Sequence, residues 1–298
     1  MADSRTTLML CGRSGAGKTS QLGQLAERIY RDSGKRSRIY VADPGGIGPI
    51  LPHVDVGIIE PVYMNTTDPW IFLSRAVRGY IRNTKGKWEV SHPEDVGGYF
   101  FESASAFGES LKANLAQAAA SGNNVGGTTM VSFSREDEGE RVGIGGNNLA
   151  HYGIGQEFIY QSIIESFKLP AEMIAWTTRL SKQTDDASAV ATISGPEILG
   201  KAKTADVPAW FMYTFRIDVV PGERRGTREV PEKHILYLGQ HKDEHTVGKP
   251  LALGNARVPL DADTPQLVIE PADITIALDQ MRDTRAQAAD RLKERLKL

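Results

Sequence analysis

The sequence contains one cysteine, Cys11, among its 298 residues. A single thiol excludes an intramolecular disulfide and any zinc site that is built from several cysteines. Cys11 ends the short apolar run Thr7–Cys11, so we expect it to be a small core residue.

The sequence also lacks long apolar runs and an excess of either charge. No apolar run approaches the roughly 18 residues that a membrane-spanning helix needs, and the first residues are polar. With 35 Lys and Arg residues against 37 Asp and Glu residues, the net charge is −2, which gives no strong overall attraction to nucleic acid or to an anionic membrane. We therefore expect a cytoplasmic protein without a membrane partner, in which any basic surface is local.

What the sequence does contain is a glycine-rich loop. Residues Gly12–Thr19 match the pattern G-x-x-x-x-G-K-[ST] at every fixed position. The apolar run Thr7–Cys11 precedes the loop, and Ser20–Tyr30 follows it with apolar residues at helical spacing. Loop N–H groups and a helix N-terminus together attract phosphate, so this order predicts a nucleotide site. Its predicted binding residues are Gly12, Arg13, Ser14, Gly15, Ala16, Gly17, Lys18, Thr19 and Ser20.

Two of these residues have chemistry beyond backbone contacts. Lys18 is expected to reach the β- and γ-phosphates of a nucleoside triphosphate. The Thr19 hydroxyl is expected to bind the Mg²⁺ ion that accompanies the phosphates. ATP and Mg²⁺ are therefore the expected ligands.

The segments around the loop predict the fold class. Strand-like runs at residues 38–43, 56–62, 96–101 and 173–178 alternate with helical patterns at residues 69–81, 107–119 and 156–167. This alternation is typical of an α/β fold, a mainly parallel sheet covered by helices on both faces. A basic turn at Lys85–Lys87 precedes Trp88 and indicates a surface hairpin.

The second half of the sequence predicts further elements. Residues 121–155 are rich in Gly and Asn and suggest a long insert. Strand-like runs at residues 189–193, 210–219 and 234–238, with a turn at Gly222–Gly226, predict an antiparallel extension on the edge of the sheet. Residues 273–298 read as a polar helix. We therefore expect one ATPase domain over residues 1–270, with the insert at 121–155, and a C-terminal helix over 271–298.

An enzyme with this loop also needs an acidic residue at the end of a neighbouring strand. Glu102 ends the apolar run before Ser103, and Asp43 ends the strand that follows the first helix, so each is a candidate metal ligand or catalytic acid. An alternative for Glu102 is that it caps the helix that follows it. Thr177 and Thr178 end the next apolar strand, where a hydroxyl is able to sense the γ-phosphate.

The C-terminal half carries a resemblance to a known family. The segments Gly195–Ala202 and Val207–Phe211, followed by a strand that contains Arg216, resemble phage-encoded RecA-like P-loop ATPases of the single-strand-annealing recombinase type. The resemblance covers roughly residues 6–260 in order of elements, and the P-loop is its only highly specific motif.

The resemblance implies a RecA-like core that forms a homo-oligomer, acts on single-stranded DNA in recombination or annealing, and works in the host cytoplasm. By position it assigns the phosphate to Lys18, the Mg²⁺ to Thr19, the Walker B acid to Glu102, the sensor to Thr178, and a basic finger that reaches a neighbour's nucleotide to Lys201.

Other functions stay open on the sequence alone. One is a nucleotide-dependent assembly ATPase of a virus with slow or no turnover, and a less favoured one is a small-molecule kinase, because the sequence has no Arg-rich lid segment. For DNA binding the candidate residues are in the insert and the hairpin tip, where the insert has the alternative of docking on another protein. These candidates are Phe133, Arg135, Arg141, Tyr152, Arg224, Arg225 and Arg228.

Overall fold

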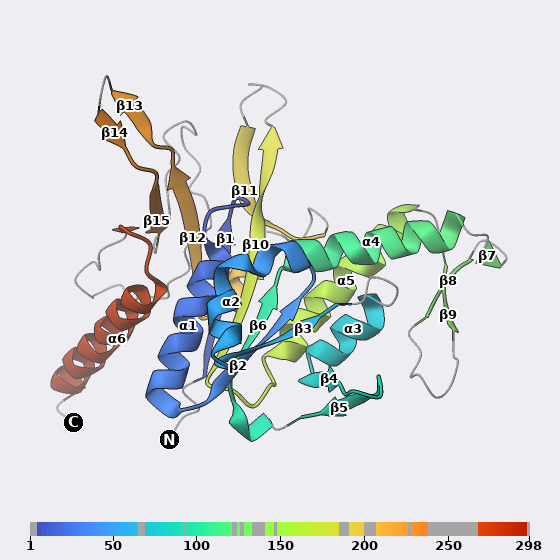
Figure 1. Cartoon of the computed structure of the whole chain (residues 1–298), viewed down its shortest axis with the longest axis horizontal. Helices are drawn as coiled ribbons and strands as arrows, with labels where there is room; N and C mark the ends of the chain where they lie inside the picture. The colour runs from blue at the N-terminus through green and yellow to red at the C-terminus, as the bar shows by residue number, and fades with distance from the viewer. Residues whose placement is uncertain are drawn as a thin grey trace.

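The computed structural model describes residues 5–64, 69–91, 93–120, 124–125, 128–132, 141–145, 148–184, 191–199, 207–225, 228–237 and 268–296. Its central feature is a nine-stranded sheet with helices on both faces (Figure 1). The predicted α/β architecture, with a mainly parallel sheet, antiparallel strands at one side and a C-terminal helix, is confirmed.

Six strands of the sheet run parallel to one another. In spatial order they are β12 (Tyr213–Val220), β1 (Thr6–Gly12), β10 (Met173–Thr184), β6 (Val96–Glu102), β2 (Arg36–Val41) and β3 (Ile59–Tyr63). Because both faces are covered, the inner strands are nearly continuous apolar runs, and every residue of β6 is buried.

Three strands join this sheet in the antiparallel direction. They are β15 (Lys233–Tyr237) beside β12, β16 (Val268–Ile269) beside β15, and β11 (Ala191–Glu197) beside β10. The expected edge position of residues 210–219 is wrong, because β12 pairs parallel with β1 inside the sheet. Among the described strands, β15 and β16 form the antiparallel side of the sheet beyond it.

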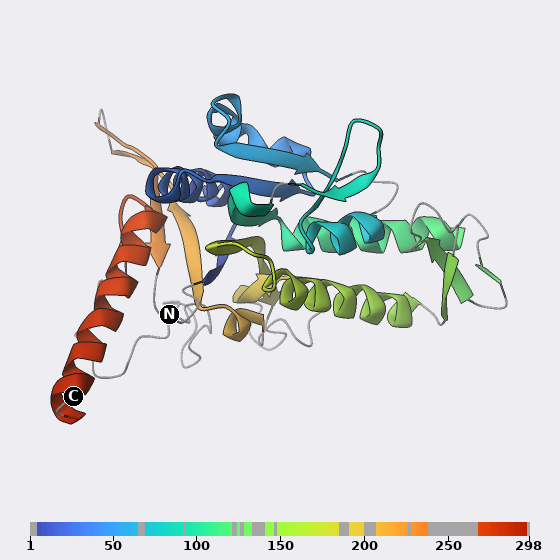
Figure 2. The same cartoon turned by 90° about the horizontal axis from the view of Figure 1, so that it is seen from below.

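The helices form two layers that bury alternate residues of each strand. Leu8 and Leu10 of β1 pack with the layer made by α1 (Lys18–Ser33) and the start of α6 (Ile274–Leu296), whereas Met9 and Cys11 pack with the opposite layer. That opposite layer consists of α3 (Pro69–Ala76), α4 (Ala104–Ala120) and α5 (Asn148–Ser166), and Figures 1 and 2 show α4 and α5 side by side. Cys11 is fully buried, as expected, and burial raises the pKa of its thiol to about 12.

Two expected helices have different bounds in the structure. The helix predicted over residues 69–81 ends at Ala76, because Gly79 adopts the left-handed conformation with φ 79° and turns the chain into a strand. That strand, β4 (Tyr80–Arg82), pairs with β5 (Trp88–Val90) in the predicted surface hairpin. The helix expected from residue 156 begins at Asn148, so the end of the predicted insert belongs to α5. Another part of the insert forms a small sheet of β7 (Asn124–Val125), β8 (Thr128–Ser132) and β9 (Arg141–Gly145).

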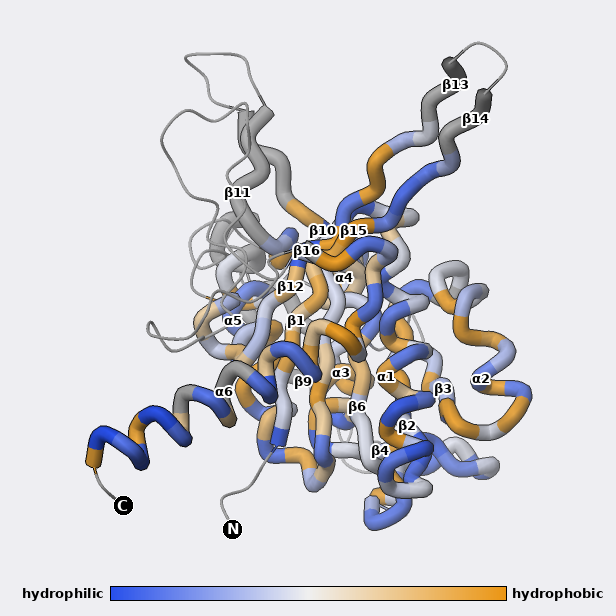
Figure 3. The backbone as a smooth tube through the Cα atoms, turned by 90° about the vertical axis from the view of Figure 1, so that its left-hand side faces the viewer, coloured by the Kyte–Doolittle hydropathy of each residue, from blue (hydrophilic) through white to orange (hydrophobic). Residues whose placement is uncertain are grey.

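Two antiparallel ribbons extend from the same end of the sheet (Figures 1 and 3). One is formed by β10 and β11, and the other by β13 (Glu223–Arg225) and β14 (Arg228–Val230) between β12 and β15. Because β1 lies between β10 and β12, the loop after β1 lies between the bases of the two ribbons. The remaining short elements are η1 (Pro44–Ile50), α2 (Leu51–Asp55), η2 (Pro93–Asp95) and η3 (Val207–Trp210).

The C-terminal helix α6 (Ile274–Leu296) is anchored to the domain at its start. Gln21 of α1 donates to the Ala272 carbonyl at 3.1 Å and accepts from the Ile274 N–H at 2.7 Å. Arg28 also pairs with Asp279 at 2.7 Å. The far half of α6 extends away from the sheet in Figure 2. Among the described helices, none is long and apolar enough to cross a membrane.

Candidate nucleotide-binding site

The glycine loop joins β1 to α1 at the carboxyl edge of the sheet. Gly15 and Gly17 have φ values of 78° and 94°, which residues with a side chain rarely adopt. Gly12 is required for a different reason, because a Cβ atom there would lie 2.6 Å from the Ile217 carbonyl oxygen of β12. The glycine spacing therefore corresponds to backbone positions that this loop needs.

Lys18 lies in the first turn of α1 with its amine folded back onto the loop. Its Nζ donates to the carbonyl oxygens of Gly12 and Arg13, each at 2.9 Å, and only 7% of the residue is exposed. Burial lowers the pKa of Lys18, while the nearby negative charge of Glu102 raises it in part. A buried ammonium held by two neutral carbonyls has no opposite charge of its own among these contacts, which suits an anionic ligand.

Glu102 ends β6 and accepts two hydroxyl hydrogen bonds. The Thr19 hydroxyl lies 3.3 Å from Oε1, and the Thr177 hydroxyl donates to Oε2 at 2.5 Å. Burial raises the pKa of the Glu102 carboxyl above its usual range, and the Thr177 bond and the charge of Lys18 oppose this shift. Four side chains from α1, β6 and β10 therefore meet at the end of the glycine loop.

The alternative role of Glu102 as a helix cap is wrong. The Ser103 hydroxyl accepts a hydrogen bond from the Ala106 N–H at 3.2 Å, and α4 begins at Ala104. Ser103 is therefore the capping residue, and both carboxylate oxygens of Glu102 point to other partners.

Asp43 lies beside this group at the end of β2. The Ala42 N–H donates to the Glu102 carbonyl at 2.7 Å, and the charge of Asp43 contributes to the raised pKa of the Glu102 carboxyl. Its Oδ1 accepts from the Gly45 N–H at 3.1 Å and caps η1. Its predicted role as a metal ligand stays a prediction.

The two threonines of β10 face opposite sides of the sheet. Thr177 contacts Glu102, whereas the Thr178 hydroxyl lies 3.0 Å from the Ser105 hydroxyl and donates to the Glu197 carbonyl at 3.0 Å. The role of Thr178 as a sensor stays a prediction, and Thr177 is the threonine that belongs to the Glu102 group. Strand alternation is the sequence signal that places Thr177 on the same side of the sheet as Glu102, because each of the two follows an aromatic residue that packs in the opposite layer.

The residues present fit Mg²⁺ and a nucleotide. The described part of the chain has no cluster of three His, Cys, Asp or Glu side chains able to hold a metal alone. A threonine hydroxyl beside a carboxylate is the partial donor set that Mg²⁺ uses when phosphates supply other ligands. Lys18 and the loop N–H groups would hold the phosphates.

Several predicted residues fall outside what the structure describes. Phe133, Arg135 and Lys201 lie outside the described residues. For five others the backbone is described but the side chain is not. Arg141 is in β9, Tyr152 in α5, Arg224 and Arg225 in β13, and Arg228 in β14.

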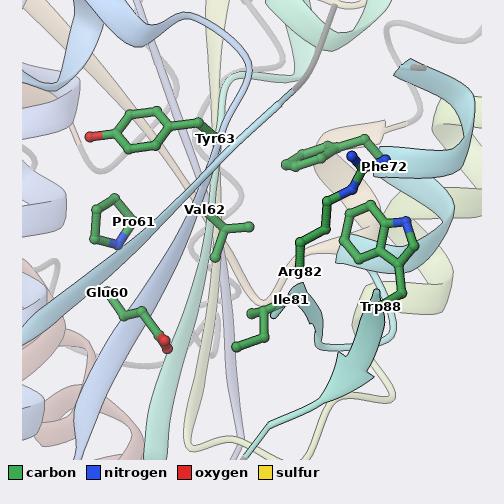
Figure 4. Close-up of a pocket in the computed structure, with 8 residues that line it drawn as sticks. All are labelled: Glu60, Pro61, Val62, Tyr63, Phe72, Ile81, Arg82 and Trp88. Carbon is green, nitrogen blue, oxygen red and sulfur yellow. The ribbon is translucent and has the colours of Figure 1, made fainter. Parts of the chain in front are cut away.

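Two cavities lie away from the glycine loop. One of about 300 Å³ is at the outer edge of the sheet between β3, α3 and the β4–β5 hairpin (Figure 4). Its lining residues are Glu60, Pro61, Val62, Tyr63, Phe72, Ile81, Arg82 and Trp88. The other, of about 570 Å³, lies between α1, α6 and the beginning of β1, and neither includes a residue of the loop.

Comparison with known proteins gives low similarities. No family model matches the chain, and no curated protein matches it. Among solved structures, a KaiC-like protein from Pyrococcus horikoshii has a TM-score of 0.40 at 12% identity, over 78% of this chain and 77% of that one. The flagellar accessory protein FlaH from Methanocaldococcus jannaschii has a TM-score of 0.38 at 10% identity, over 89% of this chain and 84% of that one. At these values the similarities add nothing to what the sheet and the loop show.

Proposed function

We propose that this chain is a Mg²⁺-dependent ATPase of the RecA-like type. The observation that carries the proposal is the buried ammonium of Lys18 on the loop carbonyls beside the buried carboxylate of Glu102. A cation and an acid at the end of one glycine loop are the two charges that phosphoryl transfer from a triphosphate requires.

Each residue of the group has a separate role. Lys18 leaves the Gly12 and Arg13 carbonyls and pairs with the terminal phosphates, where it stabilises charge that develops in the transition state. Glu102 in its ionised form orients the attacking water and accepts its proton. Thr177 holds the Glu102 carboxylate through its 2.5 Å bond, and the Thr19 hydroxyl is a ligand for Mg²⁺. Mg²⁺, when bound, neutralises charge on the phosphate oxygens.

The proposed macromolecular partner of the ATPase is single-stranded DNA. The support is the position of the loop between the bases of two ribbons, one of which carries Arg224, Arg225 and Arg228 in its β13–β14 hairpin. A polymer bound to such a ribbon is able to influence the glycine loop, because β12 continues into the ribbon and lies beside β1. On the basis of the family resemblance, the proposal includes assembly into a homo-oligomer in which Lys201 reaches a neighbour's nucleotide.

The test is ATP turnover measured with and without a single-stranded oligonucleotide, together with binding of the oligonucleotide at rising salt. We expect turnover to increase with DNA and affinity to fall with a log–log slope of about −0.7 per phosphate contacted. If the oligonucleotide does not change turnover and does not bind at low salt, the nucleotide-dependent assembly ATPase is the function that remains.

A further inference from the structure

His234 of β15 contacts the glycine loop from the far side of β12. Pairing of His234 with Val219 places it beyond the middle of β12, towards the loop. Its Nδ1 lies 3.1 Å from the Ala16 carbonyl oxygen, and a Cβ atom on Gly17 would be 3.4 Å from the same nitrogen. The ring therefore rests on the Ala16–Gly17 peptide.

This contact fixes the direction of a group that faces the ligand. In a planar trans peptide the C=O and the N–H point in opposite directions, so the Gly17 N–H points away from the ring that binds the Ala16 carbonyl. This peptide turns about ψ of Ala16 and φ of Gly17, and Gly17, at φ 94°, has no side chain that restricts the turn. We infer that His234 is a positioning residue for the nucleotide, which holds the Gly17 N–H towards the phosphates. The inference rests on the proposed nucleotide binding.

The protonation of the ring decides whether the contact holds. The Nε2 atom lies 3.2 Å from Oε1 of Glu232, and neither a carbonyl nor a carboxylate is able to donate a hydrogen bond. A ring with protons on both nitrogens therefore satisfies both partners. When the ring carries one proton, that proton lies on Nε2, because Glu232 is the stronger acceptor. The Nδ1 lone pair then faces the Ala16 carbonyl oxygen, and no hydrogen bond joins them.

The other charged groups at this junction have partners of their own. Lys233 pairs with Glu270 at 2.6 Å, and Asp273 accepts from the Thr275 N–H at 2.8 Å at the start of α6. Lys18 of α1 donates to the loop carbonyls. The contact is complete when the ring carries a proton on each nitrogen, so the proposal predicts that Mg–ATP binds more weakly at a pH at which the ring carries only one.

The experiment measures the dissociation constant of Mg–ATP by calorimetry at about pH 6 and about pH 8. His234→Asn is the matched control, because its amide N–H₂ takes the place of Nδ1 at every pH and the titration of ATP itself cancels in the comparison. We expect His234→Leu to bind about tenfold more weakly than wild type at the lower pH, and His234→Asn to bind about as wild type there. Relative to His234→Asn, wild type should lose severalfold in affinity at the higher pH.

Glu232→Gln provides a second, independent measurement. A glutamine amide is able to donate to Nε2, which leaves the single proton on Nδ1, so the pH dependence relative to His234→Asn should disappear. Equal affinity of wild type and His234→Leu, or a wild-type to His234→Asn ratio that is the same at both pH values, overturns the inference. A wild-type protein that binds no Mg–ATP at either pH overturns the proposed function itself.

Discussion

Two buried cations of this protein, Arg38 and Lys18, have opposite kinds of surroundings. Arg38 on β2 is fully buried, and each of its nitrogens has a fixed partner. Its Nε donates to Glu60 at 2.8 Å, Nη1 to the Gly79 carbonyl at 3.0 Å, and Nη2 to the Ser91 carbonyl at 3.1 Å. This set joins β2, β3 and the β4–β5 hairpin, so the charge of Arg38 serves the fold.

Lys18 is almost as buried, but its partners belong to the glycine loop that carries it. Glu102 is the carboxylate whose charge acts on Lys18, and it accepts hydrogen bonds from the hydroxyls of Thr19 and Thr177. A phosphate is therefore able to replace the two carbonyls without breaking contacts between elements of the fold. A buried cation at a ligand site is therefore distinguished from one in a structural ion pair by partners that a ligand is able to replace, and not by burial alone.

The largest effect is expected from Arg38→Met, which leaves Glu60 without its cation and two carbonyls without donors. The free energy of unfolding should fall by about 3–5 kcal/mol. This corresponds to a drop in melting temperature on the order of 10 °C, measured by calorimetry. Lys18→Met is the matched control and should melt no lower than wild type without nucleotide, because it removes a charge whose pKa is lowered mainly by burial. Equal losses in the two variants would erase the proposed difference.

Glu102→Gln should preserve nucleotide binding and reduce turnover by on the order of a hundredfold, because it removes the proton acceptor. Wild-type turnover should rise with pH through a pKa above the usual glutamate range, since burial raises the pKa of this carboxyl and only the ionised form accepts a proton. The residual turnover of Glu102→Gln should lack this rise. Unchanged turnover would transfer the role to Asp43, which Asp43→Asn then tests.

The same pKa shift predicts an effect on stability. A carboxyl whose pKa is raised in the folded state contributes stability below the usual glutamate pKa and loses it as pH rises through the raised value. Glu102→Gln should therefore melt at a higher temperature than wild type near neutral pH, and the difference should shrink in acid. A constant difference across pH would contradict the raised pKa.

The smallest effect is expected from the threonine that holds Glu102. Thr177→Val removes one donor to the carboxylate and should lower turnover by about tenfold with little change in nucleotide affinity. Thr178→Val is its neighbour-matched control and should act on stability, because its hydroxyl bonds Ser105 and the Glu197 carbonyl. If Thr178→Val lowers turnover more than Thr177→Val, then Thr178 is the sensor that the family resemblance implies.

The sequence predicts those parts of the site that are local in the chain. The loop Gly12–Thr19 and the acid at the end of an apolar strand, Glu102, are visible because spacing and strand ends are local signals. The choice between Thr177 and Thr178 required knowledge of which face of each strand turns to α1. His234 gives no local signal, since its contact joins residues 218 positions apart.

The fold follows the same division. Alternating strands and helices predict the α/β class, whereas the parallel position of β12 beside β1 is invisible to a local pattern that reads residues 210–219 and 234–238 as one hairpin. The premature end of α3 depends on the left-handed Gly79, one residue that the apolar periodicity passes over.

The most direct test of Lys18 as a phosphate-binding charge is the shift in melting temperature that Mg–ATP produces in wild type and in Lys18→Met. Ligand that binds only the folded state stabilises it by about 2.7 kcal/mol at a hundred times its dissociation constant. We predict a clear upward shift in wild type and none in Lys18→Met, while Arg38→Met retains the shift from its lower starting temperature. A wild-type protein without a shift, or a Lys18→Met variant with the full shift, would contradict the account of Lys18 as a charge held for phosphate.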